Sequence, residues 1–256
     1  MSSAASHRTS TCLAVLSLAA LGLSATASAA PTITSFKMAA IPIAGFPHTG
    51  NILGAGAVIQ GHTSISGTEY GGSPPPLTGL KLYAPTGTGL HPQGFATCAP
   101  SVLEMSGPEA CPKKSVMGPG GSVVGTVSFG GERVSETASV QLFFPPGGGG
   151  EAFVFGHTPV SIEILVKAHM VPSSPPYGVE VIGEIPLIET VPGALDASFQ
   201  EGTIEAGAAF KHGKKTVSYI TMPTKCPKSG LPVKEEMSFL GGAHAEASSK
   251  MPCPRK

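Results

Sequence analysis

The composition of this 256-residue chain, whose formal net charge is zero at pH 7, limits the kinds of protein it can be. Charged residues make up 12%, about half the usual share, and the balance of 16 basic and 16 acidic residues excludes a basic surface field for nucleic acid. The 34 glycines and 25 prolines, set beside a 41% share of hydrophobic residues, predict a loop-rich folded protein rather than a disordered one.

The amino-terminal segment 1–29 has the pattern of a secretory signal peptide. A short polar start with Arg8 precedes an apolar run at 13–23, and an Ala-x-Ala site ends at Ala29. The run is too short to span a membrane, which takes about 20 residues, and no second long run follows. We therefore expect a secreted, extracellular protein without a membrane span. Its mature part is either one domain, 30–256, or two β halves at about 30–130 and 131–256.

Short apolar runs separated by Gly/Pro turns predict strands through most of the mature chain. The expected strands are 32–38, 56–60, 63–66, 80–83, 122–129, 138–144, 152–155, 161–167, 179–188, 203–210, 216–221 and 235–239. This spacing is typical of an all-β fold, a β-sandwich or a jelly-roll-like arrangement. Alternation is clearest in 161–167, which predicts that Ile162, Ile164 and Val166 face the core while Glu163 and Lys167 face away.

At most one or two short helices fit between these strands. Pro100 is suited to the first helical position, and Gly107-Pro108 would end a helix that runs through Met105. Under three turns long, such a helix would be marginal without support from its neighbours.

The mature chain keeps four cysteines, an even number that predicts two disulfides in an oxidising compartment. Four cysteines allow three pairings, and we favour the local ones, Cys98–Cys111 and Cys226–Cys253. The spacing of the cysteines matches neither a zinc site nor a redox-active C-x-x-C motif. The histidines form no H-x-x-x-H or H-x-H pair, so we expect no metal, and we also expect no cofactor.

Sequence motifs for catalysis are weak. A Ser-His-Asp triad would have to use the single aspartate, Asp196, and no spacing singles out a pair among the glutamates. Glu235-Glu236 is interpreted as a charge pair on a strand edge. The Lys211–Lys215 segment is interpreted as a basic hairpin turn that is either simply solvated or in contact with an acidic polymer. The sequence therefore leaves the catalytic residues unknown.

Several longer segments resemble a group of uncharacterised secreted proteins of soil actinobacteria. The segments are TCAPSVLEMSGPEACPKKSVMGPG, VSFGGERVSETASVQLFFPPGGG, GHTPVSIEIL, GEIPLIETVPGA and KCPKSGLPVKEEMSF. The most specific features are the two cysteine loops and the proline after Cys111, Cys226 and Cys253. The resemblance implies export and a β-rich fold with two local disulfides, and it implies nothing about mechanism.

Two functional hypotheses follow from these observations. The first is a non-enzymatic binding or structural role at or beyond the cell envelope, with an envelope component as the candidate partner. The second is a secreted hydrolase, directed at carbohydrate, that assembles its site from dispersed glutamates. A cleft that holds two glutamates, or a buried glutamate with a raised pKa, would favour the hydrolase. A shallow surface with an exposed apolar patch would favour binding.

Overall fold

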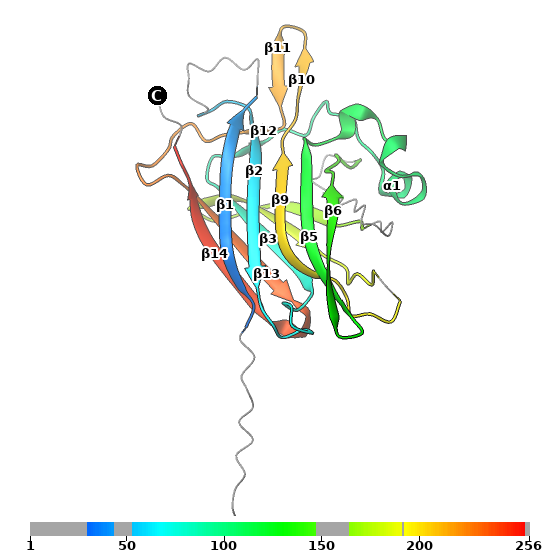
Figure 1. Ribbon diagram of the computed structural model, residues 1–256. Coiled ribbons are helices and arrows are strands. Elements are labelled where there is room, and N and C mark those ends of the chain that lie inside the picture. The colour runs from blue at the N-terminus through cyan, green and yellow to red at the C-terminus, as the bar shows by residue number, and fades with distance from the viewer. Residues whose placement is uncertain (1–29, 44–52, 147–163, 191, 254–256) are drawn as a thin grey trace, which may run out of the picture.

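Two five-stranded antiparallel sheets pack face to face in the computed structural model of the chain, which describes residues 30–43, 53–146, 164–190 and 192–253 (Figure 1). The first sheet runs in the order β1 (Thr32–Pro42), β2 (Ala57–Ser66), β9 (Ser198–Ala206), β5 (Gly120–Phe129) and β6 (Glu132–Val140). The second runs in the order β14 (His244–Met251), β13 (Leu231–Phe239), β3 (Leu77–Pro85), β8 (Tyr177–Glu184) and β7 (Lys167–Pro172). The sheets do not close into a barrel, and the predicted all-β fold is confirmed.

Strand β13 shows how alternation along the chain builds the core. Every second residue from Leu231 to Phe239 is buried, and the residues between them are partly exposed. A period of two places such residues on one face of a sheet, and here that face meets the first sheet. Near one end, Val233 packs in a cluster with Ala57 of β2, and near the other, Met237 packs in a cluster with Ile65 of β2.

The expected strand at 161–167 is wrong over its described part. Residues 161–163 lie outside the described residues, and Ile164 to Val166 form no strand, because β7 begins at Lys167. Val166 is nevertheless buried and Lys167 exposed, as expected, while Ile164 and Leu165 are both half-buried. The apolar run therefore indicates that these residues are at least partly buried, but they are not paired in a sheet. The expected strand at 152–155 and the predicted signal peptide, 1–29, also lie outside the described residues.

The first disulfide loop carries the predicted helix. Helix α1 spans Pro100–Ser106 and ends at Gly107, whose φ of 75° favours glycine. Two 3-10 turns follow it, η1 (Pro108–Ala110) and η2 (Lys113–Ser115). The loop docks onto the sandwich through Phe143, which is completely buried against Leu103 of the helix and the Cys98–Cys111 bridge.

Both predicted disulfides are present. The Cα atoms are 5.4 Å apart in Cys98–Cys111 and 5.9 Å apart in Cys226–Cys253, within the usual range for a bridge. The second bridge encloses the whole β13–β14 hairpin, and the third 3-10 turn, η3 (Leu240–Gly242), lies at the tip of that hairpin.

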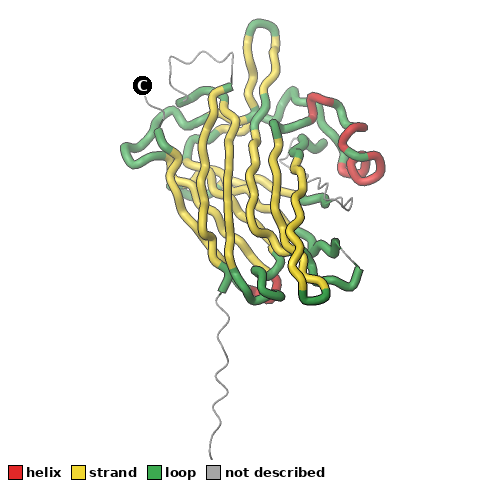
Figure 2. Tube along the Cα trace, in the orientation of Figure 1, coloured by secondary structure: helices red, strands yellow, loops and turns green. Residues whose placement is uncertain are grey.

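Two small sheets lie at one end of the sandwich. Strand β4 (Gly89–Leu90) pairs with β12 (Ile220–Thr221), and β10 (Ala209–His212) pairs with β11 (Lys215–Ser218). The β10–β11 hairpin stands out beyond both large sheets (Figure 1). Among the described residues, Figure 2 shows helical segments only in the α1 region and in the turn before β14, and strands and loops make up the rest of that part of the chain.

Candidate functional site

The outer face of the first sheet brings together a serine, a histidine and a glutamate. His62 and Ser64 are two residues apart on β2, so they lie on the same face, and Ser64 is paired with Glu201 of the neighbouring strand β9. Ser64 Oγ lies 3.3 Å from His62 Nε2, and Glu201 Oε1 lies 3.7 Å from His62 Nδ1. The order of atoms is that of a Ser-His-Glu triad, in which a carboxylate orients the base that activates a hydroxyl.

This Ser-His-Glu group is loosely held and open to solvent. The His62 side chain is 33% exposed and that of Glu201 is 53% exposed. His62 Nδ1 also lies 3.4 Å from Thr203 Oγ1, so two groups compete for one ring nitrogen. Ser64 lies in a strand that is paired on both sides. Its backbone is therefore used in the sheet and is not available to donate a hydrogen bond to the carbonyl oxygen of a substrate. The arrangement has a nucleophile and a base but lacks an evident oxyanion site.

The strand pairing is irregular on both sides of the Ser-His-Glu group. The register of β1 against β2 shifts between Ile33 and Ser35, and that of β9 against β5 shifts between Phe199 and Glu201. Thr34, the extra residue of the first shift, donates its hydroxyl to the carbonyl oxygen of Ser64 at 3.1 Å. Bulges redirect side chains and are frequent near active sites. These two irregularities are therefore the strongest local evidence that the Ser-His-Glu group is a functional site.

Glu235 is a buried carboxyl group between the two sheets. It is 3% exposed and lies in the inward row of β13, between the core positions of Val233 and Met237. Burial raises its pKa to about 7, and a 2.6 Å hydrogen bond from the Thr63 hydroxyl to Oε2 opposes that rise. Such a glutamate is the feature expected of a hydrolase, but it lies in the core among apolar side chains.

The interpretation of Glu235-Glu236 as a strand-edge pair is wrong. Strand β13 lies inside its sheet, between β14 and β3, and the two glutamates point to opposite faces. Glu236 faces outward, where Lys234 Nζ lies 2.8 Å from its carboxylate and 2.9 Å from that of Glu246. The hydrogen bond from Lys234 lowers the pKa of Glu236. The charge of Lys234 is therefore compensated by two carboxylates on this outer face.

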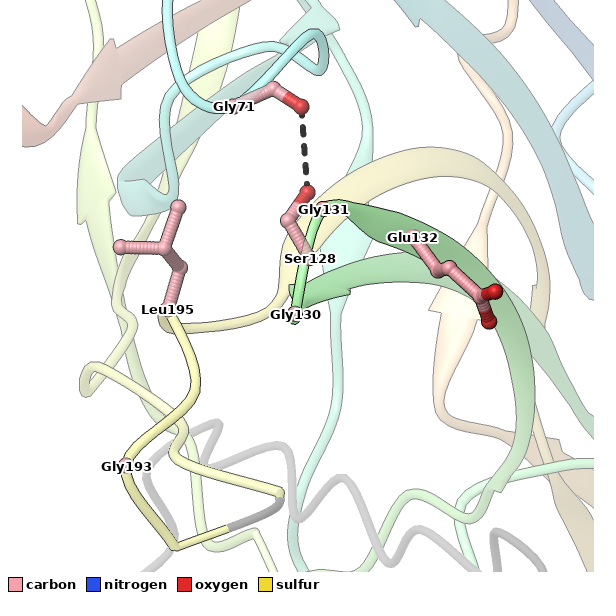
Figure 3. A pocket seen from close by; sticks show the side chains of 7 residues that line it. All are labelled: Gly71, Ser128, Gly130, Gly131, Glu132, Gly193 and Leu195. Carbon is pink, nitrogen blue, oxygen red and sulfur yellow. Dashed lines mark hydrogen bonds between the residues drawn. The ribbon is translucent and has the colours of Figure 1, made fainter.

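A shallow pocket of about 370 Å³ lies beside the turn between β5 and β6 (Figure 3). Its lining residues are Gly71, Ser128, Gly130, Gly131, Glu132, Gly193 and Leu195. The Ser128 hydroxyl donates to the Gly71 carbonyl oxygen at 3.2 Å, and the Glu132 side chain extends away from Leu195 (Figure 3). With four glycines in its wall, the pocket presents little side-chain chemistry to a ligand.

The Lys211–Lys215 turn is confirmed as the tip of the β10–β11 hairpin. His212 pairs with Lys215, so Gly213 and Lys214 form a two-residue turn, and the φ of Gly213 is +60°. All five residues of the tip are exposed. In the part of the chain that the structure describes, no ion pair joins a lysine of the tip to a carboxylate.

Aromatic packing holds the base of this hairpin. Phe210 of β10 meets Phe95 edge to face, with ring centroids 4.9 Å apart. Phe95 in turn contacts Phe144 and Tyr219, both buried. Burial raises the pKa of the Tyr219 hydroxyl to about 12, and that hydroxyl donates to Met170 Sδ at 3.2 Å. The tip is therefore mounted on a core cluster rather than on a free loop.

Among the described residues, no group of three or more His, Cys, Asp or Glu side chains could hold a metal ion. Within the same part of the chain, no helix is both long and apolar enough to cross a membrane. Asp196, the residue that a sequence-based triad would require, lies in none of the groups described above.

No family model, curated protein or solved structure matches the chain.

Proposed function

We propose that this protein is exported and binds a component of the cell envelope, at or beyond the cell surface, in a non-enzymatic role. Export is supported by the signal-peptide pattern at 1–29 and by the two disulfides, which persist in oxidising compartments. The resemblance to secreted actinobacterial proteins with two cysteine loops supports the same location.

The β10–β11 hairpin is the observation that supports a binding role. Its tip combines three lysines and a histidine, all exposed, while its base is anchored on the Phe95 cluster. On the outer face of the second sheet, by contrast, Lys234 is neutralised by two carboxylates. A projecting, fixed and uncompensated charge is suited to contact with a partner outside the protein.

Co-sedimentation with isolated envelopes of the producing cells tests this proposal. The purified mature protein, residues 30–256, is expected to pellet with the envelopes in a saturable manner. A neutral β-sandwich protein of similar size serves as the control for trapping. Recovery of the mature protein in the supernatant at every envelope concentration would contradict the binding role.

A secreted hydrolase is the second candidate, favoured by the Ser64–His62–Glu201 group. An activated serine reacts with a fluorophosphonate probe, and the adduct is found by peptide mapping. Labelling of Ser64 that disappears in Ser64→Ala and in His62→Gln would establish an activated nucleophile. Absence of labelling in the mature protein, with a known serine esterase labelled in parallel, would eliminate this candidate.

A further inference from the structure

The β10–β11 tip concentrates positive charge more strongly than the overall composition suggests. Three of the chain's 16 lysines and arginines lie within the five residues 211–215, although the chain as a whole has no net charge. The segment contains no acidic residue. A local field of this kind attracts anions even when the whole protein is neutral.

The pairing register determines where each charge lies. Lys211 is opposite Thr216, and its Nζ donates to the Thr216 hydroxyl at 2.9 Å, which holds it on one face of the hairpin. His212 and Lys215 form the next pair and share the other face, and Lys214 lies in the turn between them. Cationic groups therefore surround the tip on both faces and at its end.

The base of the hairpin is closely packed. An added Cβ at Gly94 would lie 2.6 Å from the end of the Phe210 ring, so the ring covers that glycine closely. The φ of Gly94 is +87°, a conformation that also favours glycine. A charge on a fixed support loses less conformational entropy on binding than the same charge on a free loop.

From this geometry we infer that the hairpin tip binds an extended polymer that carries a phosphate group in each repeat. The inference rests on the proposed function and specifies its ligand. The tip is a projecting two-residue turn (Figure 1), and an exposed ion pair contributes at most about 1 kcal/mol. Single small anions would therefore bind weakly, whereas a polymer engages several lysines at once.

The residue types at the tip fit phosphate groups. Lysine binds phosphate as a point charge and does not need the paired hydrogen bonds that arginine, absent from the tip, makes to carboxylate or phosphate. The turn residues Gly213 and Lys214 offer no apolar side chain for insertion into a bilayer. Of the five tip residues, only the imidazole of His212 could stack on a nucleobase, whereas proteins that bind single strands use several aromatic rings in succession.

Long-chain inorganic polyphosphate is the probe, with binding measured by fluorescence anisotropy of the labelled mature protein. On a flexible chain, each neutralised phosphate contributes about 0.7 to the slope with which log affinity falls against log salt concentration. Three phosphates therefore give a slope of about 2, and affinity should fall roughly 15-fold from 50 to 200 mM salt. Lys214→Gln/Lys215→Gln should bind about tenfold more weakly or worse at 50 mM, with a slope below about 1.

The matched control is Lys113→Gln/Lys114→Gln, which removes two exposed lysines from the η2 turn. It changes the net charge equally and should leave polyphosphate affinity within about twofold of the unchanged protein. Equal thermal unfolding of both variants and the parent would show that the folds are intact.

Several results would overturn the inference. The first is equal polyphosphate binding by Lys214→Gln/Lys215→Gln and the control variant. The second is tighter binding to polyuronate or to single-stranded DNA than to polyphosphate of equal charge. The third is binding to phosphatidylglycerol vesicles without binding to polyphosphate. If polyphosphate fails while the protein still sediments with envelopes, the ligand is wrong and the proposed function stands. If both fail, both are wrong.

Discussion

Replacement of Glu235 by glutamine removes a titrating group from the centre of the sandwich. Burial raises the pKa of Glu235 from 4.5 to about 7 in the folded protein. Between these values the folded state keeps a proton that the unfolded state has released. The free energy of unfolding therefore falls as pH rises through this window, and the fall is nearly complete by about pH 8.

The size of the effect follows from the shift. One pKa unit corresponds to about 1.4 kcal/mol, so the full shift corresponds to about 3 kcal/mol. Most of that loss, about 2–3 kcal/mol, falls between pH 5 and pH 8. Glu235→Gln keeps a side-chain oxygen for the Thr63 hydroxyl and abolishes the titration. The variant should therefore gain about 2–3 kcal/mol relative to the parent over this range, whatever fixed offset its amide introduces.

Urea unfolding at several pH values measures this difference, and the adjacent Glu236→Gln is the control. The Glu236 carboxylate faces outward and its pKa is lowered by Lys234. Its stabilising contribution is present above the unfolded pKa and is lost as pH falls. Glu236→Gln should therefore lower stability at pH 8, by at most about 1 kcal/mol for a partly exposed pair. Parallel curves for Glu235→Gln and the parent from pH 5 to 8 would refute the reasoning.

Further predictions concern export, the first disulfide and the core. Exported protein should begin at or near Ala30 on amino-terminal sequencing, and recovery of an intact Met1 form from the cytosol alone would contradict export. Substituting both Cys98 and Cys111 by serine should lower the free energy of unfolding by roughly 3 kcal/mol, because the bridge closes a loop with a sequence separation of 13. Phe143→Ala should cost about 3–5 kcal/mol in chemical denaturation, since the side chain is completely buried, and an unchanged midpoint would disprove its role.

Local patterns in the sequence were sufficient for the fold class and the cross-links, but not for every strand. Strand β14 was not predicted, because His244–Met251 is rich in small and polar residues with weak β propensity. Its pairing with β13 overrides that preference. The apolar residues at 164–166, by contrast, predict a strand that is not formed, since Leu165 packs against the Phe143 cluster without joining a sheet.

The candidate site was only partly accessible from the sequence. His62 and Ser64 lie two residues apart, but Glu201 reaches them only through the pairing of β2 with β9, which no local pattern reveals. Glu235 could have been found. The alternation of apolar residues from Leu231 to Phe239 places Glu235 at an inward position, so its burial is predictable from the sequence.

The Cys226–Cys253 bridge changes how mechanical force would pass through the molecule. The bridge joins the chain before β13 to the chain after β14, so the whole hairpin lies within a covalent loop. Tension applied beyond Cys253 would pass through the sulfur atoms directly to Cys226 and would leave the hairpin unloaded. A pull from that end could not peel the edge strand β14 from its sheet one hydrogen bond at a time. The load would instead reach the segment between β12 and Cys226, and the sandwich would resist it as a unit.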